Sequence, residues 1–316
     1  MKKPPRENIF SDSCLDRATL LRTDSVALAT RRKNESARFL LMCGTKHIVD
    51  ASGKSPRPRF FRYDEIAAYI LRNESIFLGT RDGIDYFTAE VVDGYQPENT
   101  ALSELRPLVL LFNEADASLY AYSRAMLFWH QRHLFCGSCA APTIFAAGGH
   151  ERTCSNSDCK TETIFPRIDP AIIVLVTHED RCLLGRHRKW KHNRFSTIAG
   201  FVEPGESIEQ AVRREVHEET GVEVAAVSFH SSQPWPFPSS LMIGFTAEAC
   251  SETITLHDGE LAEARWFTRE DLLKGLCSGE LFVSARLSIA YRLVSNWYRS
   301  DVQFSIEELE QLVDKH

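Results

Sequence analysis

The stretch RREVHEETG, residues 213–221, brings acidic and apolar side chains onto one face of a predicted helix. At about 100° per residue, a helix that begins at Ser207 turns one apolar stripe toward the interior. The stripe consists of Ile208, Ala211, Val212 and Val216. Glu215, Glu218 and Glu219 fall on the same side. A solvated acidic face is the usual fate of such a cluster, but carboxylates on the core-facing side repel one another and resist desolvation.

The three glutamates on this face therefore require a positively charged partner that neutralises them. The three glutamates lie three and four residues apart, so their oxygens can meet over one small region. Oxygen ligands of this kind favour a hard divalent cation, Mg²⁺ or Mn²⁺. Ser207 and Gln210 form a capping box that would start the helix. Gly221 can take the left-handed conformation that ends it.

Four of the nine cysteines form a second motif. Their spacing is Cys136-x2-Cys139-x14-Cys154-x4-Cys159. Two close pairs separated by a short loop can place four thiolates tetrahedrally around zinc. Four unrelated buried cysteines would not explain this pairing. Because four cysteines leave no open coordination position, we expect one structural Zn²⁺ per chain.

Length and charge limit the class of protein. A chain of 316 residues is long enough for two domains with a small extra module. The net charge of −6 argues against generalised binding to nucleic acid or to an anionic membrane. No apolar run approaches the roughly 18 residues of a membrane span, and the first residues lack a secretory signal. With an odd number of cysteines, these features predict a cytoplasmic protein.

The chain divides into four predicted segments. Residues 1–130 form a mixed α/β domain, and residues 131–166 form the cysteine segment. Residues 167–300 alternate strands and helices, and residues 301–316 form a last helix with a Ser305/Glu308 capping box. In the first segment we expect strand pairs at 38–50 and 75–92, the latter turning at Asp82–Gly83, and a helix over 101–133. In the third we expect strands at 171–177, 182–188, 195–202, 222–232, 240–250 and 264–268, and a helix over 284–298.

Extended in both directions, the opening stretch reads GFVEPGESIEQAVRREVHEETGV, residues 200–222. Its spacing resembles the Nudix box at every defining position. The matched residues are Gly200, Glu206, Arg214, Glu215, Val216, Glu218, Glu219, Gly221 and Val222. The resemblance implies a metal-dependent hydrolase with an α/β (α+β) fold. That fold would be a Nudix α/β/α sandwich, preceded here by the zinc ribbon and the mixed α/β domain.

The resemblance also implies roles for individual residues. Glu215, Glu218 and Glu219 are the catalytic glutamates. They hold two or three Mg²⁺ or Mn²⁺ ions, and Glu218 serves as a ligand or as the base that acts on water. Bound metals neutralise phosphate oxygens and lower the pKa of the attacking water. The Ala199 carbonyl and a later carboxylate, Glu260 in preference to Glu263, complete the metal site.

The remaining box positions are structural by the same resemblance. Glu206 and Arg214 form a supporting ion pair, and Gly200 and Gly221 satisfy backbone requirements.

A proline-rich stretch, SQPWPFPSS at 232–240, narrows the substrate. Its three prolines exclude a regular strand or helix and would stiffen a loop that presents two aromatic rings to a planar ligand. The stretch resembles the loop that distinguishes NADH pyrophosphatases, a family that also carries a zinc ribbon. The resemblance implies substrate contacts from Phe165, Gln233, Pro234, Trp235, Pro236, Phe237, Pro238, Ser239, Ser240 and Ala290.

We therefore expect an NAD(H) diphosphatase that converts NADH or NAD⁺ to AMP and the nicotinamide mononucleotide. Family members are homodimers, so a homodimer is implied, and relatives also occur in peroxisomes and mitochondria. Removal of an NAD cap from RNA by the same chemistry is the alternative. A non-catalytic dinucleotide-binding scaffold is a third reading, but such proteins typically lose box glutamates that this chain retains.

Overall fold

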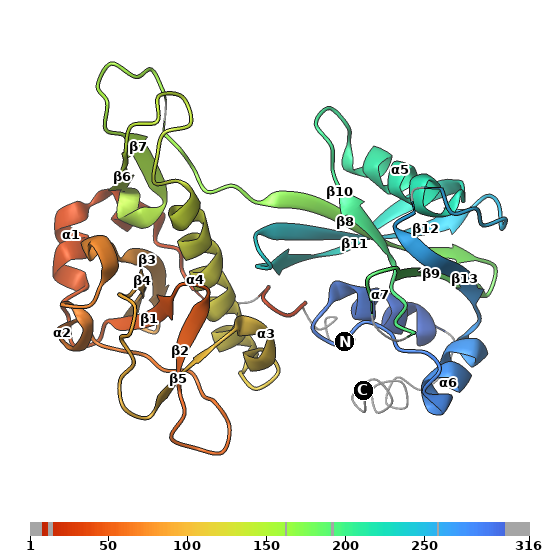
Figure 1. The fold of residues 1–316 in the computed structure, drawn as a ribbon, viewed down its shortest axis with the longest axis horizontal. Helices are drawn as coiled ribbons and strands as arrows, with labels where there is room; N and C mark the ends of the chain where they lie inside the picture. Colours follow the sequence, from red (N-terminus) through yellow and green to blue (C-terminus); the bar gives the residue numbers. More distant parts are fainter. Residues whose placement is uncertain (1–7, 12–14, 162, 191–192, 258, 301–316) are drawn as a thin grey trace. The chain divides into compact units, whose positions relative to one another are not determined.

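A computed structural model describes residues 8–11, 15–161, 163–190, 193–257 and 259–300 (Figure 1). These residues form two compact units. Unit 2 contains Phe10–Ile168 and Trp235–Ser239, and unit 1 contains the other described residues. Each unit is described by itself. In the described ranges, no helix is both long and apolar enough to span a membrane.

Unit 2 is built on a five-stranded mixed sheet in the order β3-β4-β1-β2-β5. The strands are β1 (Arg38–Cys43), β2 (Lys46–Asp50), β3 (Ile76–Arg81), β4 (Ile84–Glu90) and β5 (Thr100–Ser103). β1 lies parallel to β4, and the other neighbours are antiparallel. Asp82 and Gly83 both have positive φ in the β3–β4 turn, as the Asp-Gly signal predicts. Both predicted strand pairs are confirmed.

Short helices and one long helix surround this sheet (Figure 1). They are η1 (Thr19–Thr23), α1 (Ser25–Arg31), α2 (Tyr63–Ile66), η2 (Leu71–Asn73), α3 (Leu105–Leu108) and α4 (Glu114–Arg132). A core cluster joins residues of α1 and α2 to the aromatic side chains Phe39, Phe77 and Phe87 of the sheet. The cysteine segment adds the hairpin β6 (Thr143–Ala146) and β7 (Glu151–Cys154), joined by η3 (Ala147–Gly149).

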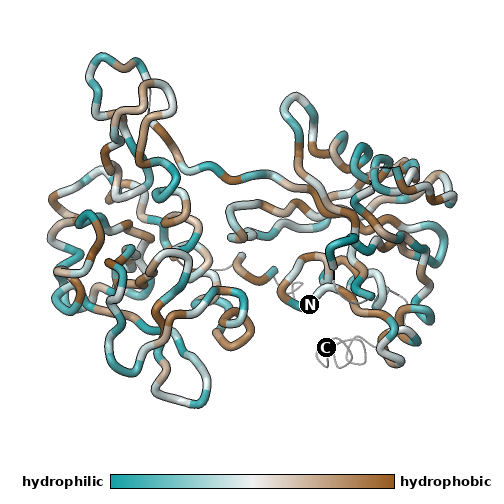
Figure 2. Tube along the Cα trace, viewed as in Figure 1, coloured by the Kyte–Doolittle hydropathy of each residue, from teal (hydrophilic) through white to brown (hydrophobic). Residues whose placement is uncertain are grey.

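Unit 1 is built on a sheet in the order β11-β12-β8-β9-β13, with β10 also paired to β8. The strands are β8 (Asp169–His178), β9 (Arg181–His187), β10 (Ile198–Phe201), β11 (Val224–Trp235), β12 (Ser240–Ala249) and β13 (Leu261–Phe267). β8 is central, and Ala171–Val176 are all buried. A continuous apolar run suits a strand that is covered on both faces. The hydrophobic colouring along these strands can be followed in Figure 2.

Helices cover both faces of the unit 1 sheet, so the α/β/α sandwich is confirmed. α5 (Ile208–Thr220) packs on one face through Ala211, Val212 and Val216. α6 (Arg269–Ser278) and α7 (Ile289–Tyr298) pack against a separate core cluster that includes Ile173 and Leu175 of β8. The sandwich fixes where the loops and helix ends that carry the predicted site can lie.

Three sequence predictions differ from the structure. The continuous helix expected over 101–133 is wrong: residues 100–103 pair with β2, residues 105–108 form the short helix α3, and the Asn113 side chain starts a new helix by accepting from the Asp116 amide. β11 runs through Pro234, although the prolines were expected to exclude a strand; β11 is an edge strand, where a missing amide is tolerated. Helix α6 was not predicted. The last predicted helix and its capping box lie outside the described residues.

Candidate active site

Helix α5 forms as its end signals predict. The Ser207 hydroxyl accepts from the Gln210 amide at 3.2 Å, and the Gln210 side chain accepts from the Ser207 amide at 2.8 Å. Gly221 ends the helix with φ 70°. The apolar stripe is fixed in the core, since Ala211, Val212 and Val216 are fully buried.

The three box glutamates differ in their burial. Glu219 is 6% exposed, the Glu215 side chain is 14% exposed and the Glu218 side chain is 51% exposed. The prediction of an inward position is therefore correct for Glu215 and Glu219 and wrong for Glu218. Glu218 lies at the edge of the helix face, where it reaches solvent.

Gly200 in β10 makes room for the Glu215 carboxylate. A β-carbon at position 200 would overlap the Glu215 carboxylate atoms. The φ of Gly200 is not in the left-handed region, so close approach is what requires glycine here. β10 and α5 therefore meet at Gly200, where the backbone of β10 carries no side chain.

Arg214 links the acidic side chains of the box. Its guanidinium lies 2.6 Å from Glu206, 2.9 Å from Glu215 and 3.0 Å from Glu218. It also donates to the Phe201 carbonyl at 2.9 Å. The Glu206–Arg214 ion pair expected from the resemblance is thus present.

These charges shift the pKa values of the box residues in opposite directions. Burial raises the pKa of Glu215, Arg214 opposes this shift, and Glu218 and Glu260 add to it. The hydrogen bond from Arg214 lowers the pKa of Glu206. The carboxylate oxygens of the box do not converge in this structure. Among the described residues, only the four cysteines bring three or more ligand atoms within 4.8 Å of one another. Arg214 supplies the positive charge between the glutamates in this structure.

A cavity of about 700 Å³ opens beside the box. It is lined by Ala199, Gly200, Phe201, Glu203, Arg214, Glu215, Glu218, His257 and Glu260. The structure thus brings Ala199 and Glu260 beside two of the box glutamates. Glu263 instead pairs with Arg186 at 3.3 Å and Arg265 at 3.0 Å.

The donor set of this cavity fits hard divalent cations. Among the described residues, four glutamate side chains, one arginine and one imidazole, that of His257, line it. Carboxylate and carbonyl oxygens are the ligands that Mg²⁺ and Mn²⁺ prefer. A cation would offset the burial that raises the pKa of Glu215, and the smaller repulsion from Glu218 and Glu260.

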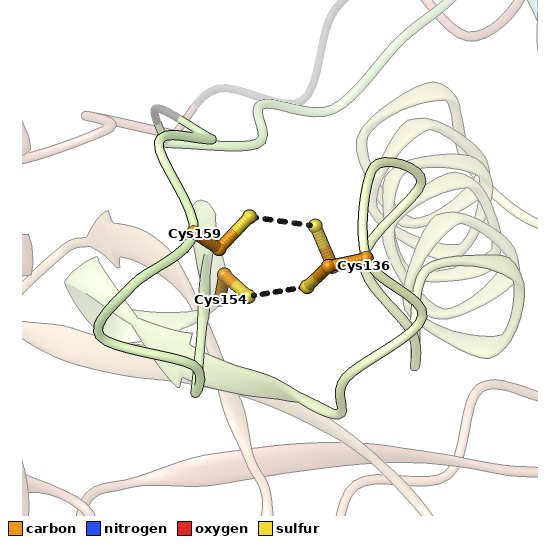
Figure 3. Close-up of side chains that lie close together, drawn as sticks. Cys136, Cys154 and Cys159 are labelled. Carbon is orange, nitrogen blue, oxygen red and sulfur yellow. Dashed lines mark hydrogen bonds between the residues drawn. The ribbon is translucent and has the colours of Figure 1, made fainter.

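The four cysteines form a metal-binding cluster in unit 2 (Figure 3). The Cys136 and Cys159 sulfurs lie 3.9 Å apart, and those of Cys139 and Cys154 lie 3.4 Å apart. Zn–S bonds of about 2.3 Å in a tetrahedron place sulfurs about 3.8 Å apart. The spacing therefore fits Zn²⁺, and no disulfide joins these residues.

The local backbone explains how the sequence builds this cluster. The Cys136 amide donates to the Ala141 carbonyl at 2.8 Å, which closes a tight turn around the first pair. The β6–β7 hairpin carries Cys154 back beside that turn. The Thr161 hydroxyl contacts the Cys136 and Cys159 sulfurs and lowers the pKa values of both thiols, that of Cys136 to about 6. A lowered pKa favours the thiolate that binds zinc.

The aromatic loop, Trp235–Ser239, belongs to unit 2. The Trp235 and Phe237 rings are 5.2 Å apart and nearly perpendicular. The Arg106 guanidinium lies 4.4 Å from the Phe237 ring centre, and Arg124 donates to the Pro236 carbonyl at 3.0 Å. The loop is therefore held against arginines, which gives it a cationic as well as an aromatic character.

Comparison with known families agrees with these two sites. The NUDIX domain matches residues 167–282, and the NADH pyrophosphatase zinc ribbon domain matches residues 131–163. The NADH pyrophosphatase-like rudimentary NUDIX domain matches residues 36–129. One relative, the NAD-capped RNA hydrolase NUDT12 of Macaca fascicularis, is 36% identical over 93% of this chain and 74% of its own length. The chain belongs to the Nudix hydrolases. Within them, it belongs to the NADH pyrophosphatase family.

Other relatives of this Nudix hydrolase come from distant organisms. The NAD-capped RNA hydrolase NudC of Mycobacterium bovis is 37% identical over 71% of this chain and 75% of its own length. Nudix hydrolase 19, chloroplastic, of Arabidopsis thaliana is 37% identical over 68% of this chain and 53% of its own length.

Several residues expected to contact substrate have other surroundings in this Nudix hydrolase. Gln233 is 1% exposed, and its amide nitrogen donates to the Leu287 carbonyl at 2.8 Å while its oxygen accepts from the Ile289 amide at 2.8 Å. This places Gln233 as the residue that holds the start of α7. Ala290, the second residue of α7, is buried in the core cluster that this helix shares with the sheet. Phe165 is 50% exposed.

Three cavity residues of the Nudix hydrolase were missed by the sequence analysis. Phe201 and Glu203 lie inside the box, at positions where the box pattern does not specify a residue. The motif therefore gave no reason to single them out. His257 lies three residues before Glu260 in an irregular segment. Nothing in its local sequence singles it out.

Proposed function

We propose that this Nudix hydrolase cleaves the diphosphate bond of NADH and NAD⁺ to give AMP and nicotinamide mononucleotide. The observation that carries the proposal is the acidic cavity of about 700 Å³ beside Glu215, Glu218 and Glu260. A volume in this range suits a ligand of cofactor size. The family membership supports a diphosphate as the bond that is cleaved.

The acidic residues of the box and of the cavity beside it have distinct proposed roles. Glu215, Glu218, Glu219, Glu260 and the Ala199 carbonyl would hold two or three Mg²⁺ or Mn²⁺ ions. When bound, such ions neutralise phosphate oxygens and lower the pKa of water. Glu218, the most exposed of the box glutamates, can reach a water molecule on the solvent side as a base.

Arg214 would keep these carboxylates ionised and in place. Its pKa is raised by Glu206, with further contributions from Glu215 and Glu218, so its charge is secure. Glu206 binds the other side of the Arg214 guanidinium and holds it in place. Arg214 therefore positions the carboxylates and does not bind the substrate.

The aromatic loop is proposed to recognise the planar end of the substrate. Trp235 and Phe237 offer ring surfaces, and Pro234, Pro236 and Pro238 limit the conformations of the backbone. Ser239, Ser240 and Phe165 remain proposed contacts. For Gln233 and Ala290, the hydrogen bonds and burial described above favour an indirect role through α7.

Hydrolysis of NAD-capped RNA is the second candidate function. The names of the NUDT12 and NudC relatives favour it. The chemistry is the same, because the cap contains the same diphosphate. The net charge of −6 favours the free dinucleotide over RNA. A non-catalytic scaffold is disfavoured, because every box glutamate is present and the relatives are hydrolases.

Oligomeric state and location complete the proposal. A homodimer is proposed, and light scattering of the purified chain tests it. A cytoplasmic location is proposed because the odd number of cysteines suits a reducing compartment.

The decisive experiment measures products from NADH, NAD⁺ and NAD-capped RNA at equal concentration, with Mg²⁺, with Mn²⁺ and with a chelator. We expect AMP from the free dinucleotides only when a divalent cation is present. Release of no AMP from NADH under any condition would refute the diphosphatase. Faster turnover of capped RNA than of NADH would make decapping the principal activity.

A further inference from the structure

Unit 2 contains a second cavity, unrelated to the Nudix box. Its volume is about 230 Å³. It is lined by Arg22, Thr23, Ser25, Leu28, Ala29, Arg32, Ser75, Phe87, Phe145, Ala146, Ala147 and Gly148. These residues come from η1, from α1 and its C-cap, from the residue before β3, from β4, from the end of β6 and from η3 (Figure 1). The cavity is thus assembled from segments far apart in the sequence.

Two arginines in this cavity lack an acidic partner. The Arg22 and Arg32 side chains make no ion pair or hydrogen bond in the part of the chain that is described, and the Nε atom of each is buried without an acceptor. Only the Tyr63 ring, 5.0 Å away, faces the Arg32 guanidinium. An arginine nitrogen withdrawn from water without an acceptor is destabilising unless a ligand supplies one.

The nearby acids are already engaged elsewhere. Asp24 accepts from the Ala27 amide and caps α1. Glu74 binds Arg72 and Arg152, and Asp85 binds Arg31 at 2.9 Å. None of these three acids neutralises Arg22 or Arg32, so among the described residues the two arginines leave the cavity with an uncompensated positive charge.

The rest of the lining is apolar or carries hydroxyl groups. Leu28, Phe87 and Phe145 supply apolar walls, and Thr23, Ser25 and Ser75 supply hydroxyls. Gly148, at φ +59°, leaves the wall open, because a β-carbon there would come within 2.9 Å of Leu28 Cδ1. Two guanidinium groups beside hydroxyls suit a phosphate, and the apolar walls suit an organic body attached to it.

Size limits the ligand further. A volume of about 230 Å³ lies below the roughly 300–1,000 Å³ of pockets that enclose drug-sized ligands. A whole dinucleotide does not fit such a space. A mononucleotide or a smaller phosphate ester does, with its outer part at the mouth.

We propose that this cavity binds a small phosphate monoester with an apolar or planar body, held through Arg22 and Arg32. The site is separate from the hydrolytic cavity and does not depend on the proposed reaction. Its occupant would bind in unit 2 and not at the box.

The test uses the full chain and AMP as the probe, in a buffer with a chelator that removes divalent cations. Hydrogen–deuterium exchange locates binding, and calorimetry measures affinity. We expect AMP to protect peptides covering residues 19–32 and 143–149. The double variant Arg22→Gln/Arg32→Gln should bind at least about tenfold more weakly at these peptides.

Matched controls make the result specific. Lys33→Gln removes one exposed positive charge next to Arg32 and should leave AMP binding unchanged. Arg22→Lys/Arg32→Lys keeps the charge but loses the planar guanidinium groups. Its affinity for AMP should therefore lie between that of the unmodified chain and that of the double glutamine variant. If the glutamine variant unfolds at a lower temperature, this lysine variant still tests the site.

Three outcomes would overturn the proposal. One is protection by AMP confined to peptides of the Nudix box. Another is protection by adenosine equal to that by AMP, which would mean that the arginines do not recognise phosphate. The last is protection by inorganic phosphate equal to that by AMP, which would mean that the apolar walls hold no organic body.

Discussion

The Glu215 carboxylate packs directly on the α-carbon of Gly200, in the space that any other side chain at position 200 would occupy. This contact joins the start of the Nudix box to its helix. It explains in physical terms why a glycine stands there: the backbone of β10 must approach a carboxylate whose pKa burial raises. The same carboxylate is held on its other side by Arg214 at 2.9 Å.

Gly200→Ala should lower turnover of NADH by about 100-fold, because a displacement of about 1 Å in a catalytic group can have an effect of that size. The β-carbon would push away the end of a flexible side chain, so the melting temperature should change little. Gly53→Ala is the control, since a β-carbon there meets only ordinary contacts. Equal turnover in the two variants would show that the Glu215 position does not matter.

Glu219→Gln should reduce turnover by at least about 100-fold, because removal of a metal ligand should exceed the 10–100-fold effect of losing a residue that supports one. The change is isosteric, so circular dichroism should be unaltered. Glu209→Gln, in the first turn of the same helix and exposed, serves as the matched control. Turnover of Glu219→Gln near that of the control would refute the metal assignment.

Cys136→Ser should abolish zinc binding and lower the unfolding temperature of the chain, because a structural zinc contributes directly to folding. Zinc content by mass spectrometry and thermal unfolding measure the two effects. Cys277→Ser changes an exposed cysteine outside the cluster and should retain one zinc per chain. A Cys136→Ser protein with full stability and no zinc would contradict a structural role.

The parts of the site that local sequence determines were predicted well. Spacing along one helix places Glu215 and Glu219 inward, and the end signals at Ser207 and Gly221 depend only on neighbouring residues. The cysteine spacing predicts the zinc cluster for the same reason, since each pair lies on one turn. Glu218 was placed wrongly because the width of the buried face depends on what packs against α5.

Features built from distant segments could not be read from the sequence. The sequence suggests that Gln233 is a loop residue. In the structure its side-chain amide forms hydrogen bonds with the backbone of Leu287 and Ile289, more than fifty residues away. The unpaired charges of Arg22 and Arg32 become visible only when Asp24, Glu74 and Asp85 are found to have other partners. Such pairings follow from topology, which periodicity does not encode.

Buried neutral histidines should make unit 2 sensitive to acid. Burial, with a smaller effect of Arg124, lowers the pKa of His47 to about 3, and burial lowers that of His130 to about 3. In the unfolded chain both titrate near about 6.5. Between these values the unfolded state binds more protons, so the free energy of unfolding falls as pH falls. The slope reaches about 1.4 kcal/mol per pH unit for each histidine.

His47→Phe should therefore reduce the loss of stability between pH 7 and pH 5 by about 2 kcal/mol, as measured by urea unfolding at both pH values. Phenylalanine fits the site, because the His47 ring already packs 4.8 Å from the Tyr120 ring and neither ring nitrogen has a hydrogen-bond partner in the described structure. Leu20→Ala, at an exposed position without a titrating group, should leave the pH dependence unchanged. An identical loss of stability in His47→Phe and in the unmodified chain would show that His47 is not held neutral by burial, and the acid sensitivity would then have to arise at other groups, such as His130, His150 or the carboxylates.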